Sequence, residues 1–310
     1  MKNVVTLTMN PAVDMNSKTN IVSGEEKLRC EKPTFNPGGG GINISRVLKK
    51  LGGDLKAFYP AGGDTGEILK NLLDEENICH QPIAVDSRTR INVSIIESET
   101  GRQFRFNMPG SKLTEEEWHG CLDIILNLDP SPDFLVASGS LPPGVPKEFY
   151  KKLAEVSKEK NCKLILDSSG QPLQYALEEG VFLIKPNLRE FTHLMGEPLK
   201  DEAQIEKHAK KIVNSGQSQV VIISLGPAGV LLIDSEDGYK HICSPITPID
   251  SRVGAGDSMV AGITFKLSEG ISLEESVYYG VAAGAAAVMT PGTELCRKED
   301  VERLFNTIYE

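Results

Sequence analysis

The sequence predicts a three-layer α/β/α domain with a mainly parallel sheet and a small β-sheet lid. In the second part of the chain, short apolar segments alternate with helical patterns, which is typical of a parallel sheet covered by helices on both faces. A hairpin pattern at 89–108 and a polar, irregular segment at 17–35 do not fit that alternation. We therefore expect residues 1–310 to form one domain, with lid segments inserted at about 15–36 and 88–110.

The first hundred residues open with a strand that Asn10-Pro11 ends. Glycines at 38–41 then precede a helical pattern, and a short apolar strand separates it from a second helix. The expected elements are strands at 4–8 and 55–59 and helices at 42–48 and 64–76.

The hairpin consists of two alternating segments, with Glu99-Thr100-Gly101 between them. Side chains two apart on a strand share a face. Those that would do so are Arg90, Asn92 and Ser94 on the first strand and Gln103, Arg105 and Asn107 on the second. These polar faces either close over a ligand or form the solvated side of a hairpin.

The later elements follow the βα alternation to the end of the chain. A polar helix beginning near Thr114 carries Trp118, which we expect to pack partly buried. The expected strands are at 134–137, 163–166, 182–184, 220–224 and 230–234, and the last long helices are at 256–267 and 273–288.

Composition narrows the class of protein and of partner. Hydrophobic residues make up 40% and charged residues 25% of the 310 residues, which is ordinary for a globular protein. The net charge of −10 repels nucleic acid and anionic lipid, so we expect neither as a partner. The six cysteines are scattered, which favours reduced thiols, and no signal or membrane-spanning pattern occurs. We expect a soluble, cytoplasmic protein.

The most informative stretch is Arg252-Val253-Gly254-Ala255-Gly256-Asp257, which leads into a helix. Small residues before a helix allow a ligand to approach free N–H groups, and the helix dipole favours an anion there. Asp257 in the first turn would accept a proton from an attacking hydroxyl. The alternative is a tight turn in which Asp257 caps the helix.

A second glycine stretch, at 37–41, also leads into a helix, and Asn43 follows it. Close backbone contact with a ligand is one interpretation of this run. A flexible loop is the other.

Two further stretches follow predicted strands. Asn187 and Glu190 are three residues apart, which suits either water-mediated Mg²⁺ binding beside nucleotide phosphates or a capping box. The segment 224–229 turns from one strand into the next. It would hold a nucleotide base or ribose, or it is a plain turn.

In this order, these stretches resemble the ribokinase-like (PfkB) family of carbohydrate kinases over nearly the whole chain. The N-terminal signature matches 38–43 and the C-terminal signature matches 254–257. Within the family the chain looks closest to the minor (type 2) bacterial 6-phosphofructokinases. The matching runs are at 24–30, 37–43, 104–110, 138–145, 167–170 and 253–260.

The resemblance implies a ribokinase-like fold and transfer of the γ-phosphoryl group of MgATP to the C1 hydroxyl of fructose 6-phosphate. Related 1-phosphofructokinases and tagatose-6-phosphate kinases usually carry lysine where this chain has Gly40, and these two activities are the alternatives. A non-catalytic sugar- or nucleotide-binding regulator is a more distant one. The resemblance also implies a homodimer formed through the lid.

The resemblance further assigns roles at matched positions. Asp14, Gly39, Gly40 and Asn43 would bind sugar hydroxyls, Lys27, Arg90 and Arg105 the existing phosphate, and Ser140 the reacting end. Lys185, Asn187, Ser224, Gly226 and Gly229 would contact ATP, and Asn187 with Glu190 would organise Mg²⁺. Gly254, Ala255 and Gly256 would form the anion hole and Asp257 the base. Backbone carbonyls near Ser251, Val253, Ala287, Thr290 and Gly292 would bind K⁺.

Two positions depart from the family pattern. Arg252 replaces a usual threonine or serine beside the anion hole, and Ala285 stands near the adenine where the most similar 6-phosphofructokinase type has a serine. Both departures bear on cation or nucleotide preference.

Overall fold

A computed structural model describes residues 2–25, 27–199, 201–235, 238–292 and 294–309. Its main sheet has the strand order β13-β12-β11-β10-β9-β8-β1-β4-β5. The strands from β11 to β5 run parallel, and β12 and β13 are antiparallel additions at one edge. Their bounds are β1 Val4–Leu7, β4 Leu55–Ala61, β5 His80–Ala84, β8 Phe134–Ser138, β9 Lys163–Asp167, β10 Val181–Ile184, β11 Ser218–Ser224, β12 Val230–Asp234 and β13 Tyr239–Ile242. The predicted mainly parallel sheet is confirmed.

Helices cover both faces of this sheet, and the strands are apolar on both sides because each face is buried. In β1, for example, Val4 belongs to one core and Val5 to the other. The first core packs under α1 Gly40–Leu51, α2 Gly63–Glu75, α8 Ala255–Ser268, α9 Leu273–Ala287 and α10 Lys298–Tyr309. The second packs under α3 Glu115–Leu126, α4 Phe149–Glu159, α5 Gly170–Glu179, α6 Leu188–Met195 and α7 Glu202–Asn214. None of these helices is long and apolar enough to cross a membrane, among the residues described.

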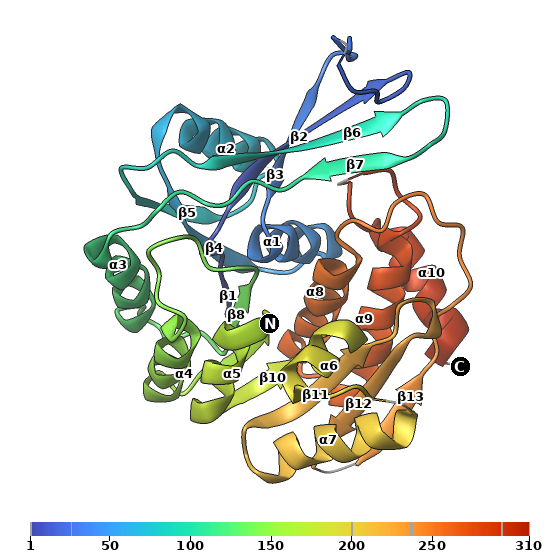
Figure 1. The fold of residues 1–310 in the computed structure, drawn as a ribbon. Helices are drawn as coiled ribbons and strands as arrows, with labels where there is room; N and C mark the ends of the chain where they lie inside the picture. Colours follow the sequence, from blue (N-terminus) through green and yellow to red (C-terminus); the bar gives the residue numbers. More distant parts are fainter. Residues whose placement is uncertain (1, 26, 200, 236–237, 293, 310) are drawn as a thin grey trace.

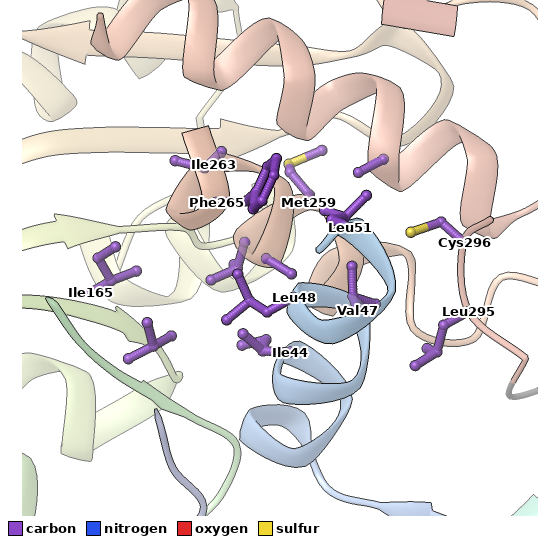
Figure 2. Packing of buried hydrophobic residues seen from close by; sticks show 14 of the residues in the cluster. Ile44, Val47, Leu48, Leu51, Ile165, Met259, Ile263, Phe265, Leu295 and Cys296 are labelled. Carbon is purple, nitrogen blue, oxygen red and sulfur yellow. The ribbon is translucent and has the colours of Figure 1, made fainter. Parts of the chain in front are cut away.

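Helices α1 and α8 meet in the first core, where Ile44 and Leu48 of α1 lie beside Met259 and Ile263 of α8 (Figure 2). Helix α9 packs closely on α8 because glycines face the contact: a Cβ on Gly280 would lie 2.4 Å from Cγ1 of Ile263. The N-terminus of α8 is therefore held firmly beside the N-terminus of α1. These are the ends that carry the two glycine-rich signatures.

A second, four-stranded sheet stands apart from the main one, in the order β3-β2-β6-β7 (Figure 1). Its strands are β2 Ala12–Thr19, β3 Thr34–Gly38, β6 Arg90–Glu97 and β7 Gln103–Phe106. Strands β2 and β6 run parallel, and the outer two are antiparallel to their neighbours. The predicted hairpin is β6 and β7, so the small-sheet lid is confirmed.

The boundaries of the first lid segment were predicted wrongly. The sequence suggested an irregular segment at 17–35, but β2 starts at Ala12 and β3 extends to Gly38. Asn36-Pro37-Gly38 looks like a loop, yet β3 is an edge strand, where a proline removes no hydrogen bond from the ladder. Strand β5 was missed at the edge of the main sheet, where Pro82 interrupts its pattern.

Candidate active site

A cavity of about 1110 Å³ lies between the lid and the carboxyl ends of the central strands. Ligands of parallel sheets bind at this end of the strands. The cavity brings together predicted residues from distant parts of the sequence: Asp14, Gly39, Gly40, Asn43, Arg90, Arg105, Ser140, Glu190, Val253, Gly254 and Asp257. The other predicted residues lie outside its lining.

Asp257 stands in the first turn of α8, where Gly254 is the N-cap with a φ of 74°. One of its carboxylate oxygens, Oδ2, accepts a hydrogen bond of 2.9 Å from Nδ2 of Asn43. Burial raises the pKa of Asp257 to about 6, and the negative charge of Asp167 adds to the shift. The bond from Asn43 and the positive charge of Lys185 oppose it. Among the described residues no backbone N–H of α8 donates to this carboxylate, which lines the cavity with a pKa near neutrality.

The pKa of Asp257 leads to a prediction about pH. Only the ionised carboxylate accepts a proton, so the kcat/KM of a reaction in which Asp257 is the base is expected to rise with pH through about 6 and then level off. Asn43→Ala removes a hydrogen bond to the ionised carboxylate of Asp257. The rise of the rate, which we call the acid limb of the pH profile, should therefore move to higher pH. Initial rates from pH 4.5 to 8.5 with both proteins provide the measurement. A limb near pH 4 in the unaltered protein would contradict the assignment.

The glycine run at the start of α1 is closely packed, so the flexible-loop interpretation is wrong. A Cβ on Gly38 would lie 2.4 Å from Oδ2 of Asp14, and one on Gly41 would lie 2.4 Å from Oγ1 of Thr8. Gly39 is the N-cap of α1 and has a φ of 110°, in a region that favours glycine. The run therefore lets the backbone approach both Asp14 and the cavity.

The lid contributes a polar inner face, as the alternation predicts. Asp14 pairs with Asn92 across β2 and β6, and Ser94 pairs with Arg105 across β6 and β7. Nδ2 of Asn92 donates a 2.8 Å bond to Oδ1 of Asp14. Burial raises the pKa of Asp14, while the Asn92 bond and the arginines Arg90 and Arg105 oppose that shift. The face thus pairs one carboxylate with two cations.

Arg90 connects the lid to the main domain. Its guanidinium donates to the carbonyl oxygens of Asn10 at 2.9 Å and Met108 at 2.8 Å. Ser140 lies nearby, and its Oγ accepts a 3.1 Å bond from Nδ2 of Asn10. Lys27, by contrast, is exposed and does not line the cavity. Of the predicted phosphate-binding cations, Arg90 and Arg105 line the cavity of this chain.

Asp167 is a site residue to which the sequence analysis gave no role. It ends β9, lines the cavity, and its Oδ1 lies 3.4 Å from Nζ of Lys185. A Cβ on Gly256 would also lie 3.4 Å from that amine, so Lys185 reaches the backbone at the start of α8. The signal was present in Asp-Ser-Ser-Gly after a strand, because a carboxylate at a parallel strand end faces such a cavity.

Asn187 and Glu190 form a capping box on α6, as one of the two interpretations predicts. Oδ1 of Asn187 accepts from the Glu190 N–H and Oε2 of Glu190 accepts from the Asn187 N–H, both at 2.9 Å. Glu190 also lines the main cavity, and both residues line an adjoining hollow of about 960 Å³. The capping role leaves the remaining carboxylate oxygen of Glu190 available to a hydrated cation beside nucleotide phosphates.

The 224–229 segment is a turn. Ser224 ends β11, and a short 3₁₀ turn, Gly226–Ala228, leads to Gly229. A Cβ on Gly229 would lie 2.0 Å from the carbonyl oxygen of Ile242, so that glycine is required for packing. Ser224 pairs with Asn187 in an isolated bridge, which places the turn beside the α6 hollow.

The predicted cation-binding segments come together near α8. The carbonyl oxygen of Val288 accepts from the N–H groups of Asp250 at 2.8 Å and Ser251 at 3.2 Å. Oγ1 of Thr290 donates to the Ala287 carbonyl oxygen at 2.9 Å. The remaining predicted positions, Val253 and Gly292, lie on the same two segments. Their carbonyl groups are the kind of donor that suits a monovalent cation.

Comparisons with known proteins agree with this geometry. The profile of the pfkB family carbohydrate kinases matches residues 2–300. The chain is 43% identical over 307 residues to "ATP-dependent 6-phosphofructokinase isozyme 2" of Mycobacterium tuberculosis, covering 99% of this chain and 90% of that protein. It is 42% identical to the protein of the same name in Escherichia coli, covering 98% of each. The crystal structure of E. coli phosphofructokinase-2 in complex with potassium superposes with a TM-score of 0.96 at 41% identity, covering 100% of both chains.

Proposed function

The chain belongs to the pfkB family of carbohydrate kinases, and we propose that it transfers the γ-phosphoryl group of MgATP to the C1 hydroxyl of fructose 6-phosphate. One observation carries this proposal: Asp257 and the Arg90–Arg105 pair line the same cavity. A phosphosugar needs both a base at one end and cations at the other. The E. coli relative has also been crystallised with fructose-6-phosphate.

The protein's own residues account for the transfer. Asp257 takes the proton of the acceptor hydroxyl, and the first N–H groups of α8 with Lys185 stabilise the negative charge on the transferring group. Arg90, Arg105 and Asp14 hold the far end of the sugar, which fixes the reacting hydroxyl in place. The lid restricts access of water, a competing acceptor.

Asn187 and Glu190 would hold the Mg²⁺ that accompanies ATP, through water. Bound there, the ion would neutralise phosphate charge and help orient the nucleotide. We also propose a K⁺ site at the carbonyl groups of Ser251, Val253, Ala287, Thr290 and Gly292. Both segments are adjacent in the structure, and the E. coli relative binds potassium in its crystal. A cytoplasmic location suits an ATP-dependent sugar kinase.

The alternatives remain within the family. "1-phosphofructokinase" of Bacillus subtilis is 35% identical over 301 residues, so fructose 1-phosphate is the nearest alternative acceptor, with tagatose 6-phosphate beside it. Coupled assays of ADP release with the three sugars, compared by kcat/KM, test the choice. The largest value with fructose 6-phosphate supports the proposal, and a larger value with another sugar replaces it. Sugar binding without ADP release would instead favour a regulator.

We further propose that two chains associate through the outer face of the lid. This face is apolar: Met15 pairs with Phe35 and Val93 with Phe106, and the rings of Phe35 and Phe106 are 42% and 49% exposed. A small sheet with a polar inner face and an exposed apolar outer face is expected to be covered on the outside. A second copy offers a matching apolar face. The E. coli relative has a tetrameric form, so assembly occurs in a close homologue.

The lid interface makes a prediction. Phe106→Asp places a charge in the proposed contact and should yield monomers at concentrations where the unaltered protein is dimeric. Tyr309→Asp is the matched control, because Tyr309 is similarly exposed (45%) but lies at the end of α10, outside the lid. Sedimentation velocity gives the mass of each protein. Equal masses for Phe106→Asp and the unaltered chain would place the interface elsewhere.

A further inference from the structure

Ser138 is the last residue of β8, and its side chain lies at the floor of the cavity. The residue is only 2% exposed. Among the described residues its hydroxyl makes no hydrogen bond, whereas the cavity-lining Ser140, after β8, and Ser168, after β9, are both bonded. A hydroxyl held at this depth without a partner is free to bond a ligand.

Gly40 faces the same point from the start of α1. A Cβ on Gly40 would lie 2.2 Å from Oγ of Ser138 and 3.3 Å from Oδ1 of Asp257. The φ of Gly40 is not in the left-handed region, so its backbone alone does not require glycine. What requires glycine is the neighbouring serine hydroxyl, and Gly40, Ser138 and Asp257 all line the cavity at this point.

We infer that Gly40, Ser138 and Asp257 form a slot for the hydroxymethyl arm that is phosphorylated, with Ser138 as a second residue in contact with the reacting hydroxyl. This inference rests on the proposed function and deepens it. Oγ of Ser138 and Oδ1 of Asp257 both lie within 3.3 Å of the Cβ position of Gly40. A single hydroxyl group can therefore form hydrogen bonds with both oxygens. Ser138 donates a hydrogen bond to one lone pair of the acceptor oxygen, and Asp257 accepts that oxygen's proton.

The remaining lone pair then faces the phosphorus. As the new oxygen–phosphorus bond forms, the bond from the γ-phosphorus to the bridging oxygen breaks, ADP leaves, and the proton stays on Asp257. Ser138 keeps its own proton throughout. Its contribution is therefore orientation, which appears in kcat rather than in the pH profile.

Ser138→Ala tests the slot directly. Loss of one hydrogen bond to the reacting group should lower kcat/KM for the sugar about tenfold, mainly through kcat, with the KM for ATP unchanged. Ser157→Ala is the matched control, because Ser157 is also a buried serine but bonds within α4, away from the cavity. That variant should keep full activity. Thermal melting identifies any loss of folding.

A double-mutant cycle with Gly40→Ala tests whether Gly40 and Ser138 border the same space in the cavity. Gly40→Ala should lower kcat/KM more than Ser138→Ala does, because the new methyl group fills the slot and meets the hydroxyl. Adding Ser138→Gly to Gly40→Ala removes that clash, so the double variant should recover activity relative to Gly40→Ala. Additive losses, or normal turnover in Ser138→Ala, would overturn the inference.

Calorimetric binding of fructose 6-phosphate without ATP separates this inference from the proposed function. If the unaltered chain turned over none of the three sugars, the proposed function would fail. Weaker sugar binding by Gly40→Ala, reversed by Ser138→Gly, would still support the slot. Unchanged binding in Gly40→Ala would reject it, whatever the activity. Should Ser138→Ala not fold, Ser138→Cys takes its place in the kinetic test.

Discussion

Asp257→Asn is expected to lower kcat by about 10²- to 10⁴-fold, the usual contribution of a general base. The amide has nearly the same shape as the carboxylate and accepts a bond from Asn43 through its oxygen, but it does not take up a proton at neutral pH. The KM for fructose 6-phosphate should change little, because Asp14, Arg90 and Arg105 hold the sugar elsewhere. Steady-state kinetics with saturating MgATP provide the measurement.

The same variant should be at least as stable as the unaltered chain. The pKa of Asp257 in the folded state, about 6, lies above the ordinary value of 3.8, so at pH 7 the folded protein carries a charge that it disfavours. The destabilisation is absent below the ordinary pKa and fully present above the raised one. Removing the charge removes this cost, as expected where catalysis is favoured over stability.

Asp201→Asn is the matched control for the loss of an acid at a helix N-terminus. Asp201 caps α7 by accepting a 2.8 Å bond from the Gln204 N–H, and it does not line the cavity. Its replacement should leave kcat unchanged and slightly lower the melting temperature. Near-normal kcat in Asp257→Asn would show that another group accepts the proton.

Much of the site was predictable because the two glycine-rich signatures carry their own constraints. Gly254 and Asp257 begin one helix, and Gly39 and Asn43 begin another, so each signature already placed a backbone N-terminus and a polar side chain. What the sequence did not supply was the distance between them. The bond from Asn43 to Asp257 spans 214 positions and exists because α1 and α8 pack together.

The parts that were missed depend on tertiary contacts. Ser138 and Asp167 each end a strand, where a small polar residue has no distinctive pattern until the sheet aligns the strand ends. The lid strand β2 carries polar residues toward the cavity and apolar ones outward, so its alternation resembled an irregular polar segment. The capping box of α6 was predictable as one of two interpretations, since its spacing is a local property of the helix.

Arg90→Ala is expected to weaken the binding of fructose 6-phosphate by about 10- to 150-fold, because charge-assisted hydrogen bonds contribute about 1.5–3 kcal/mol. Arg90 is well placed for this role, since the carbonyl oxygens of Asn10 and Met108 fix its guanidinium where the lid joins the main domain, a junction that we call the hinge. Those bonds also mean that its loss loosens the hinge. Arg105→Ala, which removes a cation on β7 with no such clamp, isolates the electrostatic part of the effect.

Fructose without a phosphate separates the two roles of Arg90. If the guanidinium binds the phosphate, Arg90→Ala should raise the KM for fructose 6-phosphate far more than the KM for fructose, and Arg90→Lys should recover part of the loss. If Arg90 acts only as a hinge clamp, both sugars should be affected equally, and lysine, which lacks the planar fork, should recover nothing. An unchanged KM for fructose 6-phosphate in Arg90→Ala would remove Arg90 from the phosphate site and leave Arg105 as the cation that this chain supplies.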